Sequence, residues 1–310
     1  MIERSGMETA LNEITLVLFT TIAPAGVMGY LAMALAVVST RDEGRACALS
    51  RHLVMPLVLA ISGLIASATH LGTPANALYV LTGVGRSPLS NEVVAAVAFL
   101  ALGGVYWILS FRDDLRRGFR IAWLAATAIA GLAFVGFIAV AYSVPSVPTW
   151  NLPTTPLALW LNTLSSGPLV GLFGMLLARQ EPGRRMAAAL LVLAACAVAA
   201  NAAVLAVQWR DLGGIATTVA RAVDLAPAMP LVICAYVACG AAGVALSGVG
   251  ALRRRMGARC LGDADGDPFA AAQRTRIARL AFAAVGAAAA LAGCFAVRFA
   301  FYALHMTLGV

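Results

Sequence analysis

The sequence predicts an all-α integral membrane protein, a bundle of eight transmembrane helices forming one domain over residues 1–310. Of its residues, 61% are hydrophobic and only 12% are charged, whereas a soluble domain averages about 45–50% apolar and about 25% charged. The apolar residues also gather in runs long enough to cross a bilayer, which takes about 20 residues of helix. No run alternates with period two, as the strands of a membrane barrel do. Lipid is therefore the solvent that this composition requires.

Eight apolar runs follow one another along the sequence. They cover roughly residues 13–39, 52–70, 92–111, 119–142, 156–178, 186–207, 228–250 and 277–302. Small residues are dense in several of them, as in the alanine-rich stretch 187–206, and small residues allow close helix packing in lipid. The longest polar stretch, residues 251–276, is too short to form a soluble domain with its own core.

The basic residues predict how the bundle is oriented. All 22 are arginine, and 17 of them lie in the segments that follow the first, third, fifth and seventh runs or within the first three residues of the run that comes next. The N-terminal segment and the other three loops hold only four. Cytoplasmic loops carry the excess of positive charge, so both termini are predicted on the outer, periplasmic side. Topology explains the net charge of +8 better than nucleic-acid binding does, because the arginines are spread over short loops.

The three loops predicted on the outer side differ in composition from the arginine-rich ones. Residues 71–91, 143–155 and 208–227 carry little charge and many Pro, Gly, Ser, Thr and Asn residues. Such residues specify defined turns, so the loops are expected to form an ordered docking surface. Within them, Trp150 and Trp209 fit either anchors at the membrane interface or contacts to a partner protein.

Ionisable residues at the outer ends of the runs are candidates for chemistry. His70 ends the second run, Glu92 begins the third, and Arg298 lies near the end of the eighth, followed by His305. Each has a structural alternative. His70 could cap the last carbonyl groups of its helix. Glu92 could interact with the positive end of a helix whose N-cap is Ser90. Arg298 could extend its side chain to the lipid headgroups. Together, an acid, a base that titrates near neutrality and a fixed cation suit proton exchange with a lipid-soluble substrate.

The small number of histidines limits how many haem groups the protein could bind. The sequence has three, and His52 and His70 lie at opposite ends of one run, about 27 Å apart by helical rise. Only His70 and His305 fall at one depth on different runs, so one bis-histidine haem is geometrically allowed and two are excluded. No other metal-ligand cluster is apparent, and the six cysteines show no CxxC or iron–sulfur spacing.

Three segments carry a family resemblance. The stretch HLGTPANALYVLTGVGRSPLSNE at 70–92 resembles a stretch in the membrane anchor subunit of bacterial dimethyl sulfoxide reductase, the DmsC family. VPTW at 147–150 and RFAFYALHMTLG at 298–309 fit the same family in order and spacing. The resemblance implies a multi-pass protein of the bacterial cytoplasmic (inner) membrane. It also implies a complex with a molybdopterin catalytic subunit and an iron–sulfur subunit that carries several [4Fe–4S] clusters.

The resemblance also implies a role for particular residues. The family binds menaquinol without haem, and no haem or metal is expected in this protein. The quinol-site histidine and glutamate of the family match His70 and Glu92. Arg298, Tyr302 and His305 match its closing helix and are expected as quinol-pocket residues. The protein would then oxidise quinol, while the terminal substrate is reduced on a partner subunit.

Two other classes of protein compete with this interpretation. One is a related quinone anchor, either of the polysulfide-reductase type or carrying haem. The other is a secondary transporter, a class that often shows inverted repeats and polar residues at mid-membrane. Here most centres of the runs lack ionisable residues, and no clear repeat is seen. Asn201 is the main strongly polar residue at mid-span, and we expect it to hydrogen-bond between helices.

Overall fold

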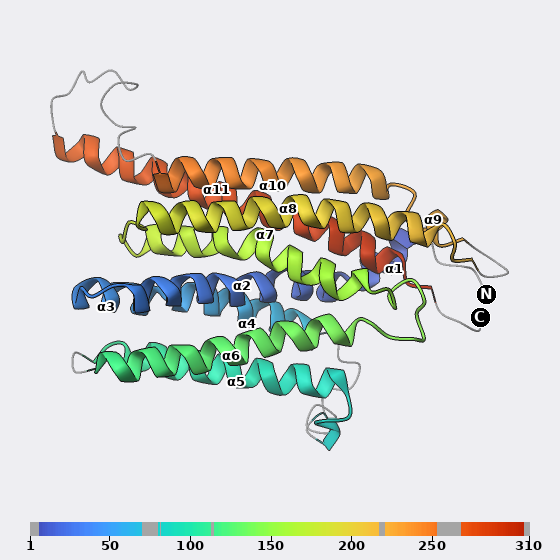
Figure 1. Cartoon of the computed structure of the whole chain (residues 1–310), viewed down its shortest axis with the longest axis horizontal. Coiled ribbons are helices and arrows are strands. Elements are labelled where there is room, and N and C mark those ends of the chain that lie inside the picture. Colours follow the sequence, from blue (N-terminus) through green and yellow to red (C-terminus); the bar gives the residue numbers. More distant parts are fainter. Residues whose placement is uncertain are drawn as a thin grey trace.

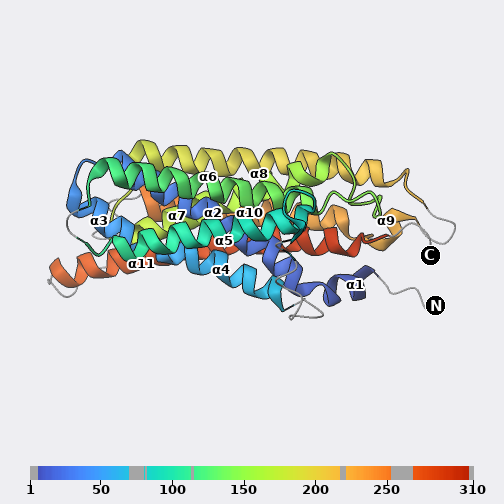
Figure 2. The same cartoon turned by 90° about the horizontal axis from the view of Figure 1, so that it is seen from below.

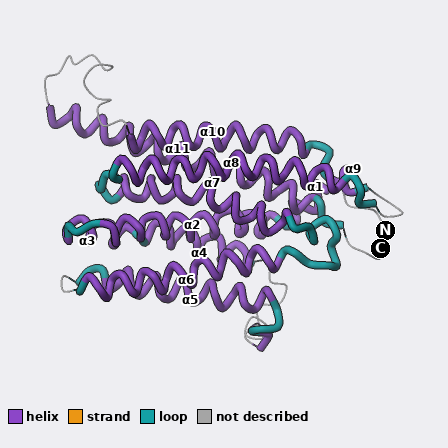
Figure 3. Tube along the Cα trace, in the orientation of Figure 1, coloured by secondary structure: helices purple, strands orange, loops and turns teal. Residues whose placement is uncertain are grey.

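The computed structural model describes residues 6–69, 80, 82–112, 115–216, 221–252 and 268–306. Within these ranges the protein is helical and has no strand, only an isolated bridge between Ala216 and Arg221. Figure 3 shows long helices joined by loops at the two ends of the molecule. The predicted all-α class is confirmed for this part of the sequence.

Eleven helices are present among the described residues. They are α1 (Gly6–Asn12), α2 (Ile14–Ser39), α3 (Glu43–His52), α4 (Val54–Ala68), α5 (Pro88–Leu109), α6 (Arg117–Ala141), α7 (Thr154–Leu177), α8 (Arg184–Leu212), α9 (Ala222–Leu225), α10 (Met229–Leu252) and α11 (Pro268–Ala303). The long ones run side by side along one axis (Figures 1 and 2).

The eight predicted spans are confirmed, because eight helical stretches in the described residues are long and apolar enough to cross a membrane. Two of them begin about nine residues earlier than predicted. The second span is Glu43–Ala68, made of α3 and α4 in succession, and α11 begins at Pro268 rather than at 277. A helix can continue beyond the apolar run, because its hydrogen bonds do not depend on hydrophobicity. At the second span, the side chain of Asp42 caps α3 by accepting a hydrogen bond from the backbone N–H of Arg45.

The centre of the bundle is formed by α2 and α7, which are the most buried of the spans. They approach closely through glycine. A Cβ on Gly29 would lie 2.7 Å from the side chain of Val170, and one on Gly171 would lie 2.5 Å from the Cβ of Ala32. The other spans surround this pair and expose large apolar side chains such as Val97 on α5. Those outer faces are suited to lipid, since their side chains are apolar and the backbone polar groups along the middle of each helix are bonded within the helix.

The expectation for Asn201 is confirmed. Its side-chain Nδ2 donates a hydrogen bond to Oδ1 of Asn162 over 2.9 Å, and both residues are buried. Asn201 lies on α8 and Asn162 on α7, so the pair joins two spans. Asn162 lies in a predicted span, but its sequence position alone did not single it out as the partner.

The two ends of the bundle differ in chemistry. We call the end that holds α1, α9, the start of α5 and the end of α11 the termini end (Figure 1). The opposite end, which holds α3 and the turns after α5 and α7, we call the arginine end. At the termini end a Cβ on Gly6 would lie within 3 Å of the carbonyl oxygens of Leu225 and Ala303, so α1 packs directly on α9 and α11.

Candidate functional site

Glu92 is held inside the termini end by the way α5 begins. Ser87 caps the helix, with Pro88 as its first residue. Before it, Gly85 adopts a positive φ of 80°, and its N–H donates to Oδ1 of Asn91 over 2.7 Å. The turn is followed directly by α5. Glu92 is the fifth residue of this helix, and its side chain is only 3% exposed. The carboxylate is therefore a buried group.

The structural alternative considered for Glu92 is wrong in its details. Ser90 is not the N-cap. It is the third helical residue, and its backbone N–H donates a hydrogen bond to the side-chain oxygen of Ser87. Glu92 lies beyond the first turn, where a carboxylate gains little from the positive end of a helix. Ser90 stood out in the sequence because serine is a common cap, but Ser-Pro favours helix initiation one turn earlier, with Pro at the first position.

Arg298 is a buried cation on α11, only 2% exposed. Its Nε donates to Oγ1 of Thr20 on α2 over 3.0 Å. Its guanidinium carbon lies 4.3 Å from the ring centre of Phe301, 5.4 Å from that of Tyr302 and 5.6 Å from that of Tyr142. A snorkelling side chain extends to water, so this alternative for Arg298 is wrong. The aromatic rings stabilise the buried guanidinium through cation–π contacts.

The segment 143–155 packs against the end of α11. The indole N–H of Trp150 donates to the carbonyl of Phe301 over 2.9 Å, and the hydroxyl of Thr149 donates to the carbonyl of Leu304. Both carbonyls lie at the C-terminal end of α11, where the regular hydrogen bonds of a helix run out, and the carbonyl of Phe301 also accepts from the backbone N–H of Leu304. The ring of Trp150 also stacks on Phe301, with centres 4.9 Å apart. Trp150 is therefore an internal packing residue, and neither surface role considered for it is correct.

Tyr302 and His305 complete this end of the bundle. Tyr302 is fully buried, and its hydroxyl donates to the carbonyl of Leu16 over 3.4 Å. His305 is exposed, and its ring centre lies 4.8 Å from that of Trp150.

Tyr142 packs against this cluster on the side that feels the charge of Glu92. Its ring lies 5.7 Å from that of Tyr302 and 6.1 Å from that of Trp150, and it is within electrostatic range of both Glu92 and Arg298. No sequence signal marked Tyr142, which ends α6 as its C-cap. Thr20 and Phe301 were also missed, because nothing in an apolar run marks the residue that a buried arginine will contact.

The structure thus brings together four of the five predicted site residues at the termini end: Glu92, Arg298, Tyr302 and His305. The fifth, His70, lies outside the described residues, and so does its proposed pairing with His305. The cluster combines a buried acid, a buried cation and hydroxyl groups within a mostly apolar setting. Such a site can bind a polar headgroup that arrives from lipid and can exchange protons with it.

A small polar cavity adjoins Arg298 between α7, α8, α10 and α11. Its polar lining comes from Thr155, Asn162, Gln208 and Arg298. Among the described residues, Oγ1 of Thr155, Nδ2 of Asn162 and Nη2 of Arg298 have no hydrogen-bond partner. The free volume, about 10 Å³, matches about one water molecule. One bound water would satisfy several of these groups, so this side of Arg298 is suited to hydration.

The fold and this cluster define a multi-pass helical membrane protein with a buried acid and a buried arginine near one membrane surface. Residues 7–252 match the family described as DMSO reductase anchor subunit (DmsC). Because the match covers more than half of the sequence, the protein belongs to this family of membrane anchor subunits. The match includes Glu92 and ends before α11. The roles expected for His70, Glu92, Arg298, Tyr302 and His305 all remain predictions.

Curated relatives agree with this assignment. The protein is 33% identical over 226 residues to the C subunit of the anaerobic dimethyl sulfoxide reductase of Escherichia coli strain K12, covering 71% of this protein and 77% of the relative. It is 30% identical over 223 residues to the C subunit of the Haemophilus influenzae enzyme, covering 71% and 78%. It is also 30% identical over 216 residues to the YnfH subunit of an anaerobic dimethyl sulfoxide reductase of E. coli, covering 70% and 75%. Membership of this family favours an anchor over a transporter.

Proposed function

We propose that this protein is the membrane anchor and quinol-oxidising subunit of a molybdopterin and iron–sulfur oxidoreductase of the dimethyl sulfoxide reductase type, located in the bacterial cytoplasmic membrane. The observation that carries the proposal is the buried carboxylate of Glu92, close to Tyr142 and the Arg298 cluster, in a member of the anchor subunit family. The proposed substrate is menaquinol, and the proposed electron acceptor is an iron–sulfur partner subunit.

The proposed proton chemistry follows from the residue types. Oxidation of one menaquinol to menaquinone releases two protons and two electrons. Glu92 accepts the proton of one quinol hydroxyl, and His70 hydrogen-bonds the other hydroxyl and accepts its proton. The positive charge of Arg298 favours the ionised form of Glu92, which is the form that can accept a proton from quinol. Quinol is proposed to enter from the lipid at the termini end, between the second, third and eighth spans.

The electrons leave one at a time to the partner's nearest [4Fe–4S] cluster, which is reduced as the quinol is oxidised. Tunnelling requires that cluster to lie close to the quinol, so the partner is proposed to dock on the termini end. The protons leave on the same side. The subunit itself therefore moves no net charge across the membrane.

Docking is predicted to depend on the exposed residues of segment 143–155. Thr149 and Trp150 are used internally, whereas Ser146 and Asn151 are exposed. The double substitution Ser146→Arg, Asn151→Arg should reduce the partner's membrane-bound fraction roughly tenfold or more, because a misplaced charge in an interface costs several kcal/mol. The measurement is cell fractionation with an assay of iron and molybdopterin in each fraction.

A control variant adds an arginine outside segment 143–155. Gln273→Arg adds an exposed arginine to α11 near the arginine end and should leave the partner bound. If the double variant kept its partner fully membrane-bound and active, segment 143–155 would not be the docking surface. If the wild-type protein purified without iron or molybdopterin, the anchor function itself would be wrong.

Orientation is predicted from the arginine distribution. Reporter fusions within residues 112–118 and 253–275 should report the cytoplasm, and fusions within 143–155 should report the periplasm. Both termini are then periplasmic. A periplasmic signal from 253–275 would contradict this orientation and move the proposed quinol site to the opposite membrane surface.

A further inference from the structure

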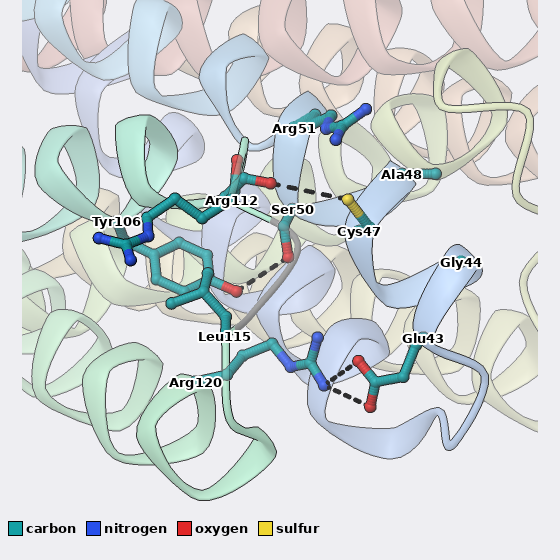
Figure 4. Close-up of a pocket in the computed structure, with 11 residues that line it drawn as sticks. Glu43, Gly44, Cys47, Ala48, Ser50, Arg51, Tyr106, Arg112, Leu115 and Arg120 are labelled. Carbon is teal, nitrogen blue, oxygen red and sulfur yellow. Dashed lines mark hydrogen bonds and ion pairs between the residues drawn. The ribbon is translucent and has the colours of Figure 1, made fainter.

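The pocket at the arginine end shows how polar side chains in this protein can satisfy one another. It lies between α3, the end of α5 and the start of α6 and has a volume of about 400 Å³ (Figure 4). Nη2 of Arg120 donates to both carboxylate oxygens of Glu43 over 2.8 and 2.7 Å. The hydroxyls of Ser50 and Tyr106 are bonded to each other over 2.8 Å. The small cavity beside Arg298 differs, because polar atoms in its lining have no such partners among the described residues.

Three buried side chains in the lining of this small cavity each carry an atom without a hydrogen-bond partner in the described part of the chain. The atoms are Oγ1 of Thr155, Nδ2 of Asn162 and Nη2 of Arg298, and the residues are 2%, 4% and 2% exposed. A buried polar group that stays unbonded loses the hydrogen bonds that it made to water in the unfolded protein. The three groups therefore need a shared partner.

Neighbouring side chains fix the position of Asn162. Its Oδ1 accepts the hydrogen bond from Asn201 on α8, which leaves Nδ2 for the cavity. Its backbone carbonyl accepts from Oγ of Ser166 over 3.0 Å and from the thiol of Cys294 over 3.5 Å. Cys294 lies on α11, about one helical turn before Arg298. Asn162 is therefore a fixed donor on α7, close to the turn of α11 that carries the arginine.

The guanidinium of Arg298 is held by a direct hydrogen bond at Nε but not at Nη2. Nε donates to Thr20, and aromatic rings cover the group. Within the described residues, no carboxylate forms an ion pair with it. An arginine in a protein stays charged, so its position decides where the positive charge acts. A second contact at Nη2 would fix that position.

One water molecule can satisfy all three atoms. The volume of the cavity, about 10 Å³, is that of about one water, and a buried water needs two to four polar partners. Its oxygen can accept from Nδ2 of Asn162 and from Nη2 of Arg298, and one of its own hydrogens can reach Oγ1 of Thr155. The cavity thus has both the size and the partners of a water site.

We propose that Thr155 and Asn162 are positioning residues, which hold the guanidinium of Arg298 in place through this water. The proposal rests on the proposed function, in which the charge of Arg298 acts on Glu92 and on the quinol site. The water anchors Nη2 from α7, while Thr20 holds Nε from α2. The two residues act on quinol only through Arg298.

The change Thr155→Val tests whether the water is bound, because valine has nearly the shape of threonine without the hydroxyl. Loss of a partner of the water should lower the melting temperature of the purified complex by about 2–4 °C. Without a bound water, the same change only removes an unpartnered hydroxyl and should raise the melting temperature. The matched control is Thr163→Val, another buried threonine of α7, whose hydroxyl donates to the carbonyl of Leu159 and does not line the cavity.

The positioning role is tested by quinol kinetics in two backgrounds. In the otherwise wild-type complex, Thr155→Val should raise the KM for menaquinol roughly threefold to tenfold, a loss of binding through a displaced cation. Turnover with a soluble electron donor should stay normal. In Arg298→Gln, the same change should raise the KM no further, because a residue that acts through Arg298 has no effect once Arg298 is gone. Thr155→Ser keeps the hydroxyl and should restore the wild-type KM, and Thr163→Val should not change it.

Three results would overturn the positioning role. They are a raised melting temperature in Thr155→Val, an unchanged KM in that variant, and an equal rise of the KM with and without Arg298. Failure of the proposed function has a different signature. Normal quinol oxidation in Glu92→Gln and Arg298→Gln would contradict that function, whereas impaired oxidation in both with normal kinetics in Thr155→Val would contradict the positioning role alone.

Discussion

Replacing Glu92 with glutamine is expected to lower menaquinol-linked turnover by roughly 100-fold or more, the usual loss when a positioned general base is removed. Glutamine has nearly the same shape, so the buried site should keep its packing, but it cannot accept a proton. Turnover with a soluble artificial electron donor, which bypasses the quinol, should remain normal. His70→Ala is expected to behave in the same way. The measurement is steady-state activity of the purified complex with each donor.

Two controls separate this role from a structural one. Asp224→Asn neutralises an exposed carboxylate on α9 at the same end and should leave both activities unchanged. Glu92→Asp keeps a carboxylate and should retain part of the quinol-linked activity. Normal quinol oxidation in both His70→Ala and Glu92→Gln would show that the quinol site lies elsewhere. Loss of both activities in Glu92→Gln would instead assign the residue to packing or assembly.

Replacing Arg298 is expected to affect both stability and quinol turnover. Arg298→Gln removes a buried cation that contacts three aromatic rings and the hydroxyl of Thr20. A desolvated cation–π contact is worth about 2 kcal/mol, and a hydrogen bond from a charged donor contributes about 1.5 kcal/mol. The Thr20 hydroxyl keeps its own bond to the carbonyl of Leu16. The free energy of unfolding should therefore fall by about 3 kcal/mol, seen as a lower melting temperature of the complex in detergent.

The electrostatic part of the role is tested by a second pair of variants. Arg298→Lys keeps the charge but loses the planar contact of the guanidinium with the rings, so its free energy of unfolding should fall as in Arg298→Gln. Its rate of quinol oxidation should be higher than that of Arg298→Gln. Arg279→Gln removes another buried arginine of α11, one that is paired with Glu181 at the arginine end. It should lower stability without changing the KM for menaquinol. Equal quinol kinetics in Arg298→Lys and Arg298→Gln would mean that Arg298 serves only the fold.

Hydrophobic runs predict the spans well because the lipid core demands about 20 apolar residues wherever a helix crosses it. They predict the ends poorly, because a helix continues into polar sequence when a cap is available. At the second span Asp42 supplies that cap, and the helix starts at Glu43 instead of near His52. The number of spans and their succession along the sequence were predictable. The central position of α2 and α7 was not, since it arises from the fit of Gly29 and Gly171 against the facing helix.

The candidate site was predictable only where a residue type is unusual for its setting. Charged residues in apolar runs are rare, so Glu92 and Arg298 stood out. Tyr142 did not, because a tyrosine at the end of a span is common at membrane interfaces. The role of Trp150 was predicted wrongly for the same reason. Its internal role depends on the carbonyl groups at the end of α11, which come close only once the whole bundle is formed.

The proposed quinol site has one central consequence, that this protein supplies electrons to an iron–sulfur partner. The most direct measurement is rapid mixing of menaquinol with the oxidised, detergent-purified complex, followed by electron paramagnetic resonance of the partner's clusters. We predict that the clusters are reduced when this protein is present and stay oxidised in the partner subunits purified without it. Equal reduction in its absence, or no reduction in the intact complex, would contradict the account.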